Sequence, residues 1–114
     1  MSVPERRKSP RFMVDVPARL SVGGEILMGR LRDVCRDAAL AETQLSFAVD
    51  TEVVLAMELP GTGGPLQLRG RIARLAPGEQ GGCGMAILFH DITPAAAARI
   101  DFFVAKQESE DRLD

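Results

Sequence analysis

The sequence predicts a mainly β protein, a six-stranded antiparallel β-barrel followed by one C-terminal helix. Apolar and polar residues alternate along several short segments that are separated by glycine- and proline-rich turns, a pattern typical of antiparallel strands. Near residue 93 the apolar spacing changes to that of a helix. With 114 residues, 46% of them hydrophobic, the chain fits one domain with a modest core. Closing the strands into a barrel would leave no exposed sheet edge.

The first predicted strand begins at Arg11 and shows the clearest alternation. One face carries only apolar residues, namely Phe12, Val14, Val16, Ala18, Leu20 and Val22. Pro17 has no N–H to donate, so it predicts an edge position or a bulge. Gly23 and Gly24 form a hairpin turn signal that leads into a second strand over 25–34.

Four further strands are predicted from short apolar segments. They cover 39–43, 52–59, 66–75 and 83–89. The segment 52–59 has the most continuous apolar run and predicts a buried strand. Glycine and proline fill 60–65 and 77–82, which predict loops.

The helix is predicted to begin at Thr93 and Pro94. Threonine is a good N-cap, and proline is favoured at the first helical position. The helix is expected to extend from Ala95 to about Gln107, with Ile100 and Phe103 as its apolar anchors. The chain therefore divides into a flexible basic arm (1–10), a barrel with its helix (11–107) and an acidic tail (108–114).

Charge is unevenly distributed along the chain. Residues 1–11 hold four cations against one anion, a net of +3, although the whole chain has a net charge of −2. Phe is the only aromatic residue type, so platforms for stacking nucleic-acid bases are scarce. We expect a local anion site and no nucleic-acid surface, although a basic segment alone is more often a solvated tail.

The sequence shows no targeting segment and nothing that suggests a disulfide. No secretory h-region or membrane-length apolar segment occurs, so we expect a cytoplasmic protein without membrane insertion. The two cysteines, Cys35 and Cys83, are expected to be reduced thiols.

Catalytic chemistry has little support. His90 is the only histidine, and its neighbour Asp91 suggests a polar strand end more than a catalytic dyad. The cysteines lack metal-ligand spacing, and we expect no metal and no cofactor. Arg69 and Arg71 are expected on the solvent face of their strand. The sequence therefore predicts a protein that is not an enzyme.

Two segments together suggest a guanine-nucleotide site. Arg7 and Arg11 have an Arg-x-x-x-Arg spacing, and guanidinium forks suit phosphates and the O6/N7 edge of guanine. Asp33, at the end of the second predicted strand, could accept hydrogen bonds from the N1 and N2 hydrogens of guanine. If the segments converge at the barrel rim, they would clamp a guanine dinucleotide.

The chain resembles the PilZ domain family over nearly its whole length. Family members have an Arg-x-x-x-Arg arm, a barrel, an Asp/Asn-x-Ser-x-x-Gly loop and a C-terminal helix, and many bind cyclic di-GMP. Arg7 and Arg11 match the arm, Arg6 and Phe12 fit its usual flanks, and Asp33 matches the first loop position. The resemblance implies a cyclic di-GMP site at Arg6, Arg7, Arg11, Asp33, Cys35 and Ala38.

The loop motif departs from the family pattern at two positions. Cys35 stands where the family has serine, and Ala38 stands where it has glycine. A thiol is a weaker hydrogen-bonding group than a hydroxyl. Ala38 is expected to strain or crowd a position where glycine permits positive φ or close ligand approach. Asp37 adds an anion near a dianionic ligand.

Two functions follow from the resemblance. In the first, the domain is a receptor that binds cyclic di-GMP at a weakened site and passes the signal to an unidentified protein effector. In the second, the degenerate domain no longer binds the nucleotide and is a protein-interaction module in motility or signalling. Either form is expected to be a monomer or a weak homodimer.

Overall fold

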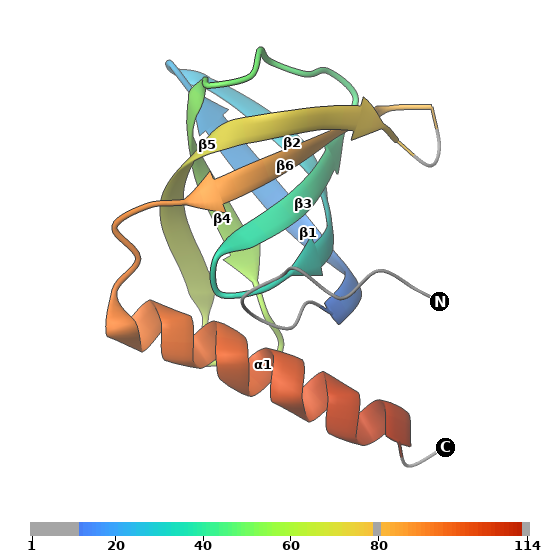
Figure 1. Cartoon of the computed structure of the whole chain (residues 1–114), viewed down its shortest axis with the longest axis vertical. Coiled ribbons are helices and arrows are strands. Elements are labelled where there is room, and N and C mark those ends of the chain that lie inside the picture. The colour runs from blue at the N-terminus through green and yellow to red at the C-terminus, as the bar shows by residue number, and fades with distance from the viewer. Residues whose placement is uncertain (1–11, 79–80, 113–114) are drawn as a thin grey trace, which may run out of the picture.

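A computed structural model describes residues 12–78 and 81–112 of the chain and contains six strands and one helix (Figure 1). In chain order, the elements are β1 (Phe12–Val22), β2 (Glu25–Val34), β3 (Ala38–Thr43), β4 (Glu52–Glu58), β5 (Pro65–Pro77), β6 (Cys83–Phe89) and α1 (Pro94–Arg112). The predicted fold class is confirmed, with most boundaries within two residues of those expected. Within the described residues, no helix combines the length and apolar character that crossing a bilayer requires.

The six strands close into a barrel in the order β1-β2-β3-β6-β5-β4, with β4 pairing back onto β1. Every neighbouring pair is antiparallel. Closure pairs each strand on both sides and so protects the edges that an open sheet would expose.

Two glycines allow neighbouring strands to approach closely. A Cβ added to Gly29 of β2 would lie 2.2 Å from the carbonyl oxygen of Glu42 in β3. A Cβ added to Gly70 of β5 would lie 2.5 Å from the carbonyl oxygen of Leu88 in β6. Any larger side chain at either position would force the strands apart, so both glycines are required by packing.

The irregularity predicted around Pro17 is present in β1. The β1–β2 register shifts between Met13 and Val16, which fits a bulge just before the proline. The β1–β4 ladder begins only at Ala18, opposite Met57, so Pro17 lies where β4 has already parted from β1. Proline, which lacks an N–H, is tolerated at such a position, where one neighbouring strand is missing.

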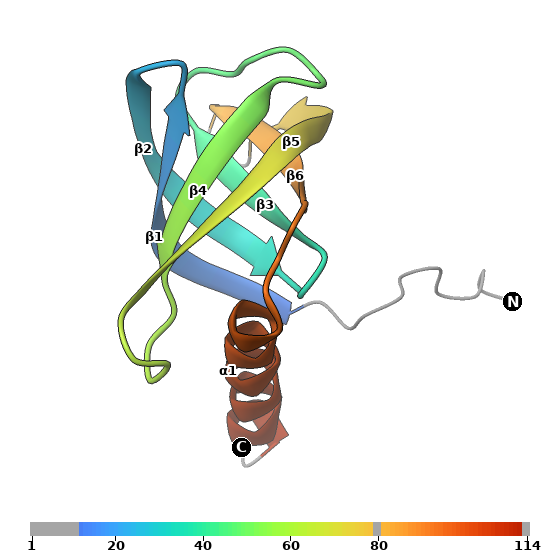
Figure 2. The same ribbon diagram turned by 90° about the vertical axis from the view of Figure 1, so that its left-hand side faces the viewer.

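Apolar side chains fill the barrel, and α1 lies across one of its open ends (Figures 1 and 2). Ile100 and Phe103 are 0% and 2% exposed and belong to the same core as the strand residues, which confirms them as the helix anchors. The largest of the fully buried strand side chains are Leu20, Leu31, Val34, Leu55, Met57, Ile72, Met85 and Ile87.

The helix begins as predicted and ends later than predicted. The N–H of Ala96 donates to Oγ1 of Thr93 at 3.1 Å, which is an N-cap contact. The helix continues to Arg112, beyond the expected end near Gln107. Glutamate, lysine, arginine and glutamine are good helix formers, so a polar, charged segment can extend a helix that is already anchored.

An ion-pair cluster on the outer face of β1–β3 gives a pH-dependent prediction. Asp15 accepts a hydrogen bond from Nε of Arg30 at 2.7 Å and lies 3.2 Å from Nη1 of Arg32. The hydrogen bond from Arg30, aided by both positive charges, lowers the pKa of Asp15. Since the folded-state pKa lies below the unfolded-state value, the stabilisation is present above the unfolded-state pKa and is lost as pH falls through the folded-state pKa.

We expect Arg30→Gln to raise the pKa of the Asp15 carboxyl toward its ordinary value. A carbon-detected NMR titration of side-chain carboxyl groups measures this directly. Arg74→Gln is the control, because Arg74 is an exposed arginine on β5, away from this cluster. An Asp15 midpoint that is the same in Arg30→Gln and wild type would contradict the assignment.

Candidate functional site

The start of β1 lies beside the end of β2. In the register of the two strands, Phe12 is opposite Val34 and Met13 is opposite Asp33. The basic segment 6–11 immediately precedes Phe12 in the sequence. The chain therefore enters the barrel next to the β2–β3 turn, as the predicted clamp requires. Arg6, Arg7 and Arg11 themselves lie outside the described residues.

Asp33 is buried at this end of the barrel. It is 6% exposed and pairs with Met13 on one side and Leu40 on the other. Little of the carboxylate faces solvent in this conformation. The Asp33 carboxylate could accept from the guanine N1 and N2 hydrogens, as predicted, only if it became more accessible than it is here.

Cys35 holds the β2–β3 turn together. Its backbone N–H donates to the carbonyl of Ala38 at 2.9 Å, and its Sγ accepts from the backbone N–H of Asp37 at 3.4 Å. The side chain is 5% exposed, so the sulfur faces the turn and not solvent. The carbonyl of Asp37 in turn accepts from the N–H of Phe89, which attaches the turn to β6 at 2.9 Å.

Ala38 has an ordinary backbone, and the prediction that it would be strained is wrong. Among the described non-glycine residues, only Asp50 and Asp91 have positive φ. Ala38 is the first residue of β3 and pairs with Leu88, so strand pairing sets its extended conformation. The Ala38→Gly substitution tests the separate prediction that the methyl group of Ala38 crowds a ligand.

Arg36 is a further cation of the turn that no sequence motif identifies. Its Nε lies 3.5 Å from Oδ2 of Asp101 on α1, and its side chain is 47% exposed. The pair connects the turn to the helix. Only its place between Cys35 and Ala38 could have drawn attention to it, since Asp101 is far away in the sequence.

The remaining candidate catalytic or basic residues, around His90 and Arg69, lie away from the β2–β3 turn and contact carboxylates. Nε2 of His90 is 2.8 Å from Oε1 of Glu52, and its Nδ1 is 3.5 Å from Oδ2 of Asp91. Arg69 pairs with Asp91 at 3.0 Å on the outer face of β5, as expected for a solvent-facing residue. These contacts describe a polar strand end. In the part of the chain that the structure describes, no three His, Cys, Asp or Glu residues gather into a group that could hold a metal ion.

Comparison with solved structures shows the same fold in several other proteins. The inhibitor of motility MotI/DgrA of Bacillus subtilis has a TM-score of 0.82 and 12% identity, covering 94% of this chain and 53% of that one. The PilZ domain of Escherichia coli YcgR, solved with c-di-GMP, has a TM-score of 0.76 and 12% identity, covering 95% of both chains. The Klebsiella pneumoniae MrkH–c-di-GMP complex has a TM-score of 0.76 and 17% identity, covering 96% of this chain and 56% of that one.

The chain thus spans only about half the length of MotI and MrkH. No curated protein matches its sequence significantly. The family model for the PilZ domain, however, matches residues 5–106, from the basic segment to the helix. The chain therefore belongs to the PilZ domain family.

Proposed function

We propose that this domain binds cyclic di-GMP between its basic arm and the β2–β3 turn, and passes the signal to a protein partner. The observation that carries the proposal is the pairing of Phe12 with Val34, since it brings the entry of the Arg7-x-x-x-Arg11 segment to the turn that holds Cys35 and Ala38. Membership of the PilZ family and the c-di-GMP complexes of YcgR and MrkH support the choice of ligand.

Positive charge near the β2–β3 turn complements a dianionic ligand. Residues 1–11 carry a net charge of +3, and Arg36, which pairs with Asp101, lies at the turn. Arg7 and Arg11 supply paired donors to phosphate oxygens or to a guanine edge. Arg6 adds to the local positive potential, and Asp37 opposes it.

The proposed output is a new surface made when the arm closes over the ligand. The bound nucleotide and the residues that contact it would form a surface that the free protein lacks, and a partner can recognise it. The role is regulatory, and the proposal includes no catalytic step.

Isothermal titration calorimetry of the wild-type domain at low salt tests binding. A saturable heat with cyclic di-GMP, and none with GMP at the same concentration, is the expected result. Absence of heat at ligand concentrations on the order of hundreds of micromolar would contradict the proposal. It would favour the second function, a PilZ domain that acts as a nucleotide-independent interaction module.

The Cys35→Ser substitution is expected to tighten cyclic di-GMP binding by up to about tenfold. A hydroxyl is a better acceptor for the Asp37 N–H than the Cys35 sulfur, so it should hold the β2–β3 turn more firmly in the conformation proposed to bind the ligand. Ala38→Gly is expected to add less, because Ala38 is unstrained.

Calorimetry on the two single variants and the double variant measures these effects. Cys83→Ser is the matched control, because Cys83 is a half-buried thiol at the start of β6, away from the β2–β3 turn. Equal affinity in Cys35→Ser and wild type would show that the natural thiol does not weaken the site.

A further inference from the structure

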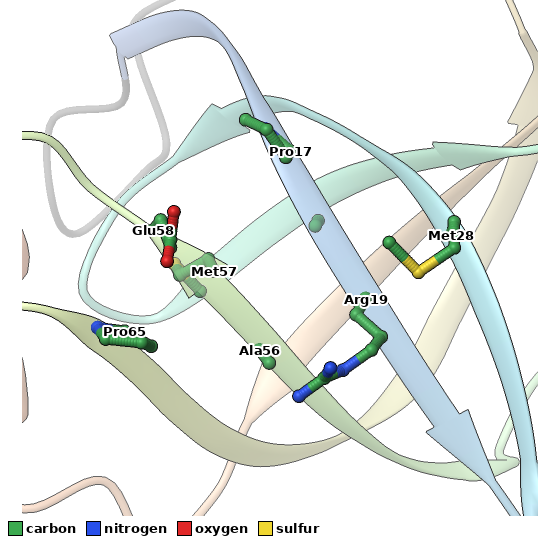
Figure 3. A pocket seen from close by; sticks show the side chains of 8 residues that line it. Pro17, Arg19, Met28, Ala56, Met57, Glu58 and Pro65 are labelled. Carbon is green, nitrogen blue, oxygen red and sulfur yellow. The ribbon is translucent and has the colours of Figure 1, made fainter.

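A groove lies on the outside of the barrel at the seam between β1 and β4. It has a volume of about 320 Å³, and its lining includes Pro17, Arg19, Met28, Ala56, Glu58 and Pro65 (Figure 3). The groove exists because the β1–β4 ladder ends at the Ala18–Met57 pair, so the strands separate at Pro17. A second hollow of about 420 Å³ shares Pro17 and Glu58 and continues toward Pro60 and Gly64.

A prominent apolar side chain stands at the edge of this groove. Met28 of β2 is 68% exposed, and Ile26 on the same strand face is 60% exposed. An exposed methionine is an adaptable contact residue, because its flexible side chain fits hollows of irregular shape. The face therefore offers both a protruding apolar group and a hollow that could receive one.

Opposite charges flank the groove without pairing. Figure 3 shows Arg19 and Glu58 on opposite sides of Ala56 and Met57. Arg19 is opposite Ala56 in the β1–β4 register, so Glu58 lies two residues further along β4. Within residues 12–78 and 81–112, neither forms an ion pair.

Most other arginines of the described chain have carboxylate partners on the same molecule. These arginines are Arg30, Arg32, Arg36, Arg69 and Arg71. Arg19 and Glu58 thus combine exposure, opposite charge and a shared apolar groove.

We infer that this face is the interface of a reversible homodimer with twofold symmetry. In a twofold interface, each contact between different residues occurs twice, with the roles of the two copies exchanged. Arg19 of one copy then meets Glu58 of the other, and Glu58 of the first meets Arg19 of the second. Met28 of each copy enters the groove of its partner. The inference does not depend on nucleotide binding, because the groove is separate from the β2–β3 turn.

Sedimentation velocity of the full chain, over about a hundredfold range of protein concentration, tests the interface. The wild type is expected to show a concentration-dependent monomer–dimer equilibrium without nucleotide. Arg19→Glu and Glu58→Arg are each expected to weaken dimerisation roughly tenfold or more, because each replaces two attractions with two repulsions. The double variant Arg19→Glu/Glu58→Arg is expected to restore it, since reversing both charges recreates the pairs.

Two controls make the outcome decisive. Arg74→Glu changes an exposed charge outside the groove and is expected to leave the equilibrium unchanged. Thermal unfolding of each variant checks that the fold is intact, which is expected because Arg19 and Glu58 are exposed. A wild type that stays monomeric would overturn the inference. A dimer insensitive to either single reversal, or a double variant that fails to recover, would also overturn it.

Discussion

Replacing Arg7 or Arg11 with alanine is expected to abolish measurable binding of cyclic di-GMP. Each guanidinium can make two parallel charge-assisted hydrogen bonds to a phosphate or a guanine edge. A hydrogen bond to a charged group contributes about 1.5–3 kcal/mol, so losing a bidentate pair weakens binding on the order of a hundredfold or more. Calorimetry at low salt measures the loss, since salt screens exposed charges.

Two variants separate the fork geometry from the charge. Arg11→Lys keeps the positive charge but loses the planar fork, so its affinity is expected to lie between those of wild type and Arg11→Ala. Arg74→Ala removes an exposed arginine of β5 outside the site and is expected to bind like wild type. Retention of wild-type affinity by both Arg7→Ala and Arg11→Ala would exclude the arm from the site.

Replacing Phe103 with alanine is expected to lower the free energy of unfolding by about 3–5 kcal/mol. Phe103 is 2% exposed and packs in the core where α1 covers the end of the barrel. Removing the ring leaves a cavity between the helix and the strands, which the rigid barrel can fill only partly. Domains of this size have a total stability of roughly 5–15 kcal/mol, so the loss is a large fraction of the total.

The adjacent phenylalanine provides a matched control. Phe102 is 57% exposed, so Phe102→Ala is expected to change the free energy of unfolding by less than about 0.5 kcal/mol. Urea denaturation monitored by circular dichroism measures both variants under the same conditions. Equal losses from Phe102→Ala and Phe103→Ala would contradict the burial of one face of α1.

The strands could be predicted because a barrel strand has one buried and one solvent-facing side. Apolar residues therefore recur at every second position along such a strand, as they do in β5 from Leu66 to Ile72. The N-cap at Thr93 was equally readable, because it depends on local chemistry. The end of α1 could not be predicted, because charged residues such as Glu108 occur both in helices and in solvated tails.

The geometry of the turn could not be read from the motif. Substitution of glycine by Ala38 suggested strain, but strand pairing to Leu88 decides the backbone conformation there. The contact between Arg36 and Asp101 joins residues far apart in the chain. The groove between Arg19 and Glu58 likewise depends on β4 pairing with β1 and on that pairing ending at Ala18 and Met57. Such features depend on register and closure, which a local pattern does not encode.

The most direct test of the central claim follows backbone amide shifts of the nitrogen-15-labelled domain during titration with cyclic di-GMP. If the arm and the turn form one site, amides in 6–11 and 33–38 will shift together and give the same dissociation constant. GMP, which lacks the second nucleotide, is expected to leave them nearly unchanged. Binding that shifts only one segment, or saturating ligand that shifts neither, would contradict the account.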